Sequence, residues 1–86
     1  MQTLKVKKDS VVKSVAGAIA GECRKEGECE LIAIGPAAVN QAVKAIATAR
    51  GFAVQDGYDF TAIPTFTEVE VENEKKSAIK FNIKKI

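Results

Sequence analysis

The fold of this chain is decided by the stretch GPAAVNQAVKAIATARGF, residues 35–52. It directly follows the short apolar run Leu31–Ile34, which is typical of a buried strand. Pro36 suits the first turn of a helix, because the N–H group that proline lacks would have no partner there. The helix is expected to end near Arg50, with Gly51 as its left-handed C-terminal residue. The stretch therefore predicts a strand followed by a helix whose polar side chains form a binding surface and carry no catalytic set.

An earlier helix is expected from the loop at Lys8–Ser10 to about Glu26, capped by Asp9 or Ser10 and ended by Gly27. Apolar residues at helical spacing predict the buried face of each helix. For the first helix these are Val12, Val15, Ala16, Ile19 and Cys23, and for the second they are Val39, Val43, Ile46 and Ala47.

Two glycines interrupt the first helix, Gly17 and Gly21, and each costs about 1 kcal/mol relative to alanine. A close approach of the helix backbone to another element would offset this cost. The second helix offers a matching surface of small side chains, formed by Ala38, Ala42, Ala45 and Ala49. Packing against a second subunit and contact with the backbone of a ligand are the alternative explanations.

Four strands are expected, at Thr3–Lys7, at Glu28–Ile34, at Asp59–Glu72 with a break or bulge at Pro64, and around the alternating residues Ile79, Phe81 and Ile83. The turn before the last strand is expected at Asn73–Lys76, with Glu70 and Lys80 on one outer face. The nearly unbroken apolar end of the second strand predicts burial on both faces, with helices on one side and another subunit or layer on the other. The order β-α-β-α-β-β predicts an α+β two-layer sandwich with a four-stranded mixed sheet and two helices on one face.

The bulk composition indicates one small cytoplasmic domain. Its 86 residues form a single core, here assigned to residues 1–86, and so small a core gains stability from oligomerisation. No apolar run approaches the roughly 20 residues of a membrane span, and the N-terminus lacks the apolar region of a secretory signal. Cys23 and Cys29 are expected to be reduced thiols in the core or at its edge.

The residues offer little for catalysis. The chain has no histidine, the commonest general base and metal ligand, and its two cysteines lack further ligands for zinc. Ser10 and Ser14 have no base nearby in the sequence. We therefore expect no enzyme activity, no metal site and no cofactor.

The net charge of +2 conceals separate charged blocks. The N-terminal lysines are Lys5, Lys7, Lys8 and Lys13. Residues 56–74 carry six acids and no base, whereas residues 75–86 carry five lysines and no acid. These blocks predict either oppositely charged strands that pair with each other or a molecule with one basic face that contacts phosphates.

The sequence resembles the stage V sporulation protein S family along nearly its whole length. The resemblance rests on the segments Ser14–Gly21, Ala33–Gly35, Asn40–Ala45, Ala49–Phe52 and Ile63–Thr67. It implies a small cytoplasmic bacterial protein that influences late sporulation and coat assembly. It also implies a fold of the Alba type, which associates as dimers or larger assemblies.

Alba proteins bind nucleic acid as dimers, through basic residues at the starts of both helices and through a long basic hairpin arm. By position, the resemblance assigns Lys7 and Lys8 to the first element and Asn40, Gln41 and Lys44 to the second. The hairpin departs from the pattern, because it is short and carries four glutamates between Glu68 and Glu74. Two functions follow: a homodimeric or larger regulator that binds DNA or RNA, or a regulatory module that binds a protein or a small ligand and no nucleic acid.

Overall fold

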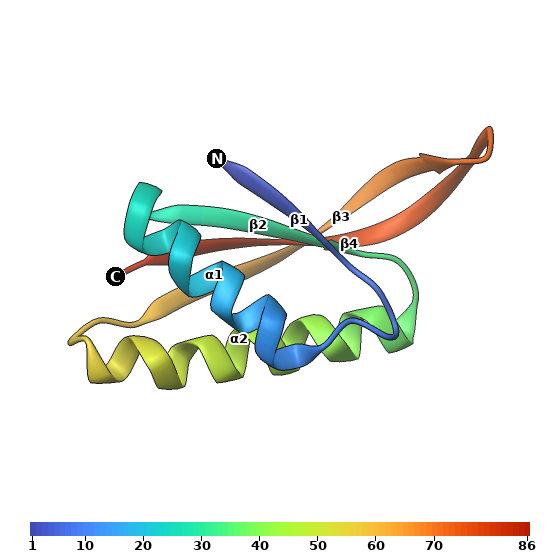
Figure 1. Cartoon of the computed structure of the whole chain (residues 1–86). Helices are drawn as coiled ribbons and strands as arrows, with labels where there is room; N and C mark the ends of the chain where they lie inside the picture. Colours follow the sequence, from blue (N-terminus) through green and yellow to red (C-terminus); the bar gives the residue numbers. More distant parts are fainter.

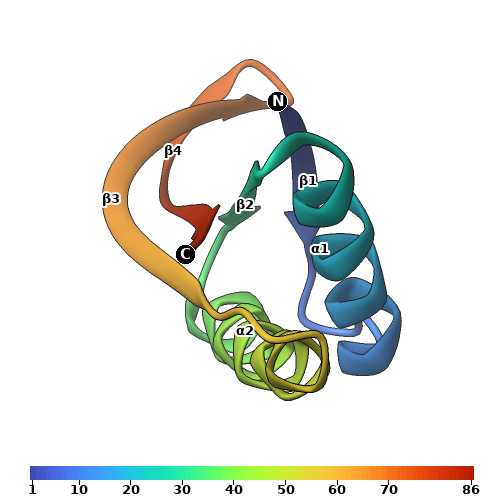
Figure 2. The ribbon, with the colours of Figure 1, turned by 90° about the vertical axis from the view of Figure 1, so that its left-hand side faces the viewer.

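The sheet has four strands, arranged in the order β1-β2-β4-β3 in a computed structural model that describes residues 1–86. The strands are β1 (Gln2–Val6), β2 (Glu28–Ala33), β3 (Phe60–Val71) and β4 (Glu74–Lys85). β1 pairs with β2 in parallel, and both β2 and β3 pair with β4 antiparallel. The helices α1 (Val12–Glu26) and α2 (Pro36–Gln55) cover one face of this sheet (Figures 1 and 2). The predicted α+β sandwich with a mixed sheet is therefore confirmed.

β2 runs through the middle of the sheet, and its burial alternates along the strand. Cys29, Leu31 and Ala33 point toward the helices and are buried, whereas Glu30 and Ile32 on the other face are half-buried. Within the single chain this strand is therefore buried on one face, and cover of its other face by a second subunit stays a prediction. The helices cover one face, and the other stays partly open.

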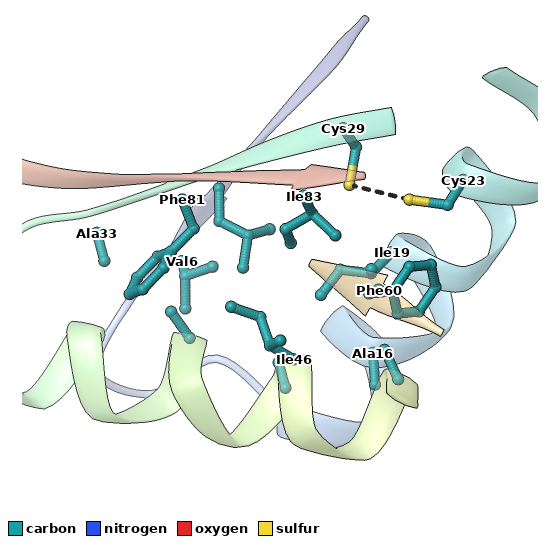
Figure 3. Close-up of a cluster of buried hydrophobic side chains, with 14 of the residues drawn as sticks. Val6, Ala16, Ile19, Cys23, Cys29, Ala33, Ile46, Phe60, Phe81 and Ile83 are labelled. Atoms are coloured by element: carbon teal, nitrogen blue, oxygen red, sulfur yellow. Dashed lines mark hydrogen bonds between the residues drawn. The ribbon is translucent and has the colours of Figure 1, made fainter. Parts of the chain in front are cut away.

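The core lies between the sheet and the helices, and small side chains make up much of it (Figure 3). On α2 the buried residues are Ala38, Ala42, Ala45, Ile46, Ala49 and Ala53. The predicted stripe on this helix is thus correct for Ile46 and wrong for Val43, which is 49% exposed, and for Ala47, which is also exposed. The reason is that α2 packs against α1 as well as the sheet, and alanines let helices approach closely where valines would not.

The glycines of α1 do not make the expected close contact. Gly17 and Gly21 are exposed, and a Cβ atom added at either position would meet no atom within 4 Å. The α2 alanines pack instead against the face of α1 that carries Ala16, Ile19 and Ala20. Close packing within the single chain is therefore wrong as the explanation for the glycines, and packing against a second subunit stays a prediction.

Replacing Gly17 or Gly21 with alanine is expected to stabilise the protein by about 0.5–1 kcal/mol each. Neither backbone needs glycine, because neither has a positive φ, and alanine loses less chain entropy on folding. Gly27→Ala is the control and should destabilise, because Gly27 ends α1 with φ 82°. Urea unfolding measures all three changes, and a loss of stability in both α1 variants would show that these glycines contact something.

The ends of the helices differ from expectation in two places. Val11 occupies the N-cap of α1 without a side-chain hydrogen bond, so neither Asp9 nor Ser10 caps this helix. α2 continues through Gly51 to Gln55, because Ala53 in the extra turn is fully buried and its burial favours another turn of helix. The predicted end of α1 at Gly27 is confirmed.

The β3-β4 hairpin turns earlier than expected, at Glu72 and Asn73, and its two strands of 12 residues each show that the expectation of a short hairpin is wrong. Both residues have positive φ, 52° and 65°, as in the two-residue type I′ turn that matches the twist of paired strands. In this register Glu70 lies opposite Lys75, and Lys80 lies opposite Thr65. Because side chains alternate along a strand, Glu70 and Lys80 lie on opposite faces, and their predicted pairing is wrong.

Pro64 lies within an unbroken β3, so the expected break or bulge is absent. β3 is an edge strand that pairs with β4 alone. Proline is tolerated there, because one side of an edge strand needs no ladder hydrogen bond.

Arg50 on α2 and Asp59 at the start of β3 form a two-pronged ion pair, with distances of 2.8 Å from Nε to Oδ1 and 2.9 Å from Nη2 to Oδ2. The hydrogen bond from Arg50, together with one from the Phe60 N–H, lowers the pKa of Asp59 to about 2. A carboxylate with a lowered pKa stabilises the folded state above its unfolded pKa near 4, and this contribution is lost as the pH falls toward 2.

Asp59→Asn is therefore expected to lower the melting temperature near neutral pH, and its difference from the parent protein should shrink between about pH 4 and pH 2. Thermal melts across this range measure the effect. Asp9→Asn, which removes an exposed carboxylate without an ion-pair partner, is the control. A difference between Asp59→Asn and the parent that stays constant with pH would contradict this account.

Candidate nucleic-acid interface

The first part of the site is the turn between β1 and α1, which carries Lys7 and Lys8. Ser10 closes this turn twice: its Oγ accepts a hydrogen bond from the Lys7 N–H at 2.8 Å, and its own N–H donates to the Lys7 carbonyl at 3.0 Å. Both lysine side chains are exposed. The turn thus holds its backbone in place while its two ammonium groups remain in solvent.

The second part of the site is the beginning of α2. Gly35 precedes it with φ 87° and ψ 161°, a conformation that is essentially restricted to glycine. No side chain caps this helix, so N–H groups of its first turn keep their donor capacity. Asn40 and Lys44 are exposed and lie four residues apart, hence on one side of the helix.

Gln41 joins the two parts. Its side-chain Nε2 donates a 2.8 Å hydrogen bond to the backbone carbonyl of Ser10. This bond fastens the turn that carries Lys7 and Lys8 to the first half of α2. The structure therefore joins the Lys7–Ser10 turn to the segment of α2 that carries Asn40, Gln41 and Lys44, and it gives the half-buried Gln41 a positioning contact within the chain.

The lysines of this region are not neutralised within the chain. The ion pairs of the protein are Met1 amino group–Glu26, Arg24–Asp56 and Arg50–Asp59. None of them involves Lys7, Lys8 or Lys44. The strands that carry the acidic and basic blocks of the hairpin pair with each other, but among the acids Glu70 alone lies opposite a lysine, Lys75, and the two form no ion pair. Lys5, the lysine within β1, lies opposite Ile32 of β2 and has no acid directly across from it.

The two cysteines lie in the core, away from this surface. Their sulfur atoms are 4.0 Å apart, and both residues are buried free thiols, as expected. Burial raises the pKa of Cys23 and, together with the neighbouring Cys23, raises that of Cys29 to about 12. Both thiols therefore stay protonated and unreactive near neutral pH.

A model of one protein family, described as stage V sporulation protein S, matches residues 2–86. The chain belongs to this family. The match covers essentially the whole chain and confirms the resemblance seen in the sequence, so this is a small sporulation-related protein. Neither helix is long and apolar enough to cross a membrane.

The sequence did not reveal two features of the family member described here. The Gln41–Ser10 bond joins residues 31 positions apart, and no sequence pattern marks a side chain that donates to a distant carbonyl. Lys5 also lies near the beginning of α2, where it lines a pocket together with Lys7 and Lys8. Its position could have been inferred, because Lys5 alternates with Leu4 and Val6 and so must point away from the helices.

Proposed function

We propose that this protein is a cytoplasmic, non-enzymatic regulator that binds DNA or RNA as a homo-oligomer. The contact surface comprises Lys7 and Lys8 on the β1-α1 turn and Asn40 and Lys44 on α2. The Gln41–Ser10 hydrogen bond carries the proposal, because it joins two distant polar segments into one surface. The family's association with sporulation is consistent with a regulatory role.

The physical basis is electrostatic. Exposed ammonium groups without ion-pair partners can contact phosphates and release condensed counterions, a sequence-independent source of affinity. The uncapped beginning of α2 adds the positive end of a helix dipole, and Asn40 adds side-chain N–H donors. The acidic strand between Glu68 and Glu72 would repel a phosphate backbone, so it lies outside the proposed contact.

Fluorescence anisotropy at several salt concentrations tests the function, with labelled duplexes of DNA and of RNA. The proposal predicts binding at low salt. The logarithm of the binding constant should then fall linearly with the logarithm of the salt concentration. The slope estimates the number of phosphates contacted, at about 0.9 per contact for duplex DNA. No binding to either duplex at low salt would refute the proposal and favour a module that binds a protein or a small ligand.

The homo-oligomer rests on apolar side chains that the single chain leaves exposed. Phe66 on the edge strand β3 is 80% exposed, and Ile63 on the opposite face of that strand is 59% exposed. A strand with one unpaired edge and large exposed apolar side chains is suited to association with a second copy. A core of this size also gains stability from such a contact.

Phe66→Glu is expected to shift the protein from an oligomer to a monomer, because the new carboxylate would be buried in the contact. Sedimentation velocity at micromolar concentration measures the change, with Phe52→Glu on α2, 38% exposed in the parent chain, as the control. If the parent protein is already a monomer at ordinary salt, the oligomer is refuted. If Phe66→Glu leaves the oligomer intact, the contact lies elsewhere.

A further inference from the structure

A pocket of about 580 Å³ opens where the parallel strands β1 and β2 end. Its apolar lining comes from the continuous segment between β2 and α2 and from the distant strand β3. The residues are Ile32 and Ile34 in and after β2, Pro36–Ala38 at the beginning of α2, and Val69 and Val71 on β3. The far half of the β3-β4 hairpin extends beyond the helices (Figure 1). Val69 and Val71 on this part of β3 line the pocket together with Val6 at the end of β1. The volume lies within the range of natural small-molecule sites.

The rim of this pocket is basic. Lys5, Lys7 and Lys8 line it, and none of the three forms an ion pair. Glu70 is the acidic residue of the lining, and it lies opposite Lys75 on the neighbouring strand. An apolar chamber with three unpaired ammonium groups and one carboxylate at its edge is complementary to a molecule with an apolar body and an anionic end.

We propose that this pocket binds a small amphipathic anion. The apolar body would lie against Ile32, Ile34 and Val69, where it replaces water on side chains that are only partly covered. The anionic head would lie at the rim beside Lys7 and Lys8. This ligand site does not depend on nucleic-acid binding, although the two surfaces share Lys7 and Lys8.

The site is tested with decanoate as the probe and the full-length ¹⁵N-labelled protein. Amide chemical shifts are recorded during titrations with decanoate, with acetate, which has the charge and no apolar body, and with decanol, which has the body and no charge. We expect saturable shifts with decanoate at Ile32, Ile34, Ala37, Val69 and Val71. Acetate should cause no such shifts, and decanol should bind roughly tenfold more weakly than decanoate.

Two variants should separate the apolar and charged contributions. Ala37→Trp fills the chamber from the exposed first turn of α2 and should abolish decanoate binding, and Val69→Trp fills it from the hairpin if the first variant does not fold. Lys7→Gln combined with Lys8→Gln should weaken decanoate binding roughly tenfold and leave decanol unchanged. Lys25→Gln combined with Lys84→Gln removes the same charge at the other end of the sheet, where Lys84 lies opposite Glu28 and Thr61, and should change neither.

Four results would overturn the proposal. They are shifts that do not saturate, shifts centred on other residues, equal affinity for decanoate and decanol, and binding that survives a folded tryptophan variant. Each is independent of the nucleic-acid assay, so failure of this site and failure of the proposed function remain distinguishable.

Discussion

Replacing Lys7, Lys8 and Lys44 together with alanine is expected to weaken nucleic-acid binding at low salt by roughly tenfold or more. Each lysine is exposed and has no ion-pair partner within the chain, so each is available to contact a phosphate. The slope of the logarithm of the binding constant against the logarithm of the salt concentration should become shallower by about 2–3, because three phosphate contacts are lost. The loss should be similar for all duplex sequences, since contacts to phosphates carry no base information.

A matched control separates the position of these lysines from their total charge. Lys25, Lys75 and Lys76 are also exposed and carry the same three charges, but they lie at the end of α1 and beside the hairpin turn. Their replacement with alanine should change the affinity much less. Equal losses in the two triple variants would indicate a nonspecific charge effect or a contact through the hairpin, and parental affinity in the first variant would exclude the proposed surface.

Leu31→Ala is expected to produce the largest loss of stability, about 2–5 kcal/mol. Leu31 is fully buried in β2, between β1 and β4 and beneath the helices, so the cavity left behind has little room to collapse. A domain of this size has a total stability on the order of 5–10 kcal/mol, so the variant is expected to be partly unfolded at physiological temperature.

Urea unfolding of Leu31→Ala measures this loss, and Ile63→Ala on the edge strand is the control. Ile63 is 59% exposed, so its truncation should cost well under half as much. A loss for Leu31→Ala no greater than that for Ile63→Ala would mean that the core does not lie where the structure places it.

Element types and order could be predicted from the sequence, because they follow from local patterns. The alternation of Phe81 and Ile83 with lysines identified β4, and Gly27 marked the end of α1. Errors arose where a tertiary contact outweighed a local signal. Gly51 predicts the end of α2, but the helix continues for one more turn because Ala53 is buried there.

The face of α2 was mispredicted for a similar reason. Ranking by hydrophobicity selects Val43, whereas packing against α1 and the sheet together selects alanines. In the hairpin, the position of the turn sets the register, so a small error in placing the turn put Glu70 and Lys80 on the same face.

The sequence could predict which residues form the candidate site. It could not predict how those residues are arranged in space. Lys7 and Lys8 stand out as part of a basic block, and Asn40 and Lys44 as polar positions on an alanine-rich helix. Their proximity depends on the contact between Gln41 and Ser10 and on the chain reversal after β1, which no local pattern encodes. The pocket could not be predicted from the sequence either, because its lining residues come from β1, β2, α2 and β3.

The proposed surface is tested most directly by amide chemical-shift mapping of the full chain with a short DNA or RNA duplex at low salt. The account predicts the largest shifts at residues 7–11 and 37–44, joined by the Gln41 side-chain amide, whose bond to Ser10 links the two segments. Shifts confined to the hairpin between Glu68 and Lys76, or no shifts at a duplex concentration that saturates the anisotropy signal, would contradict it.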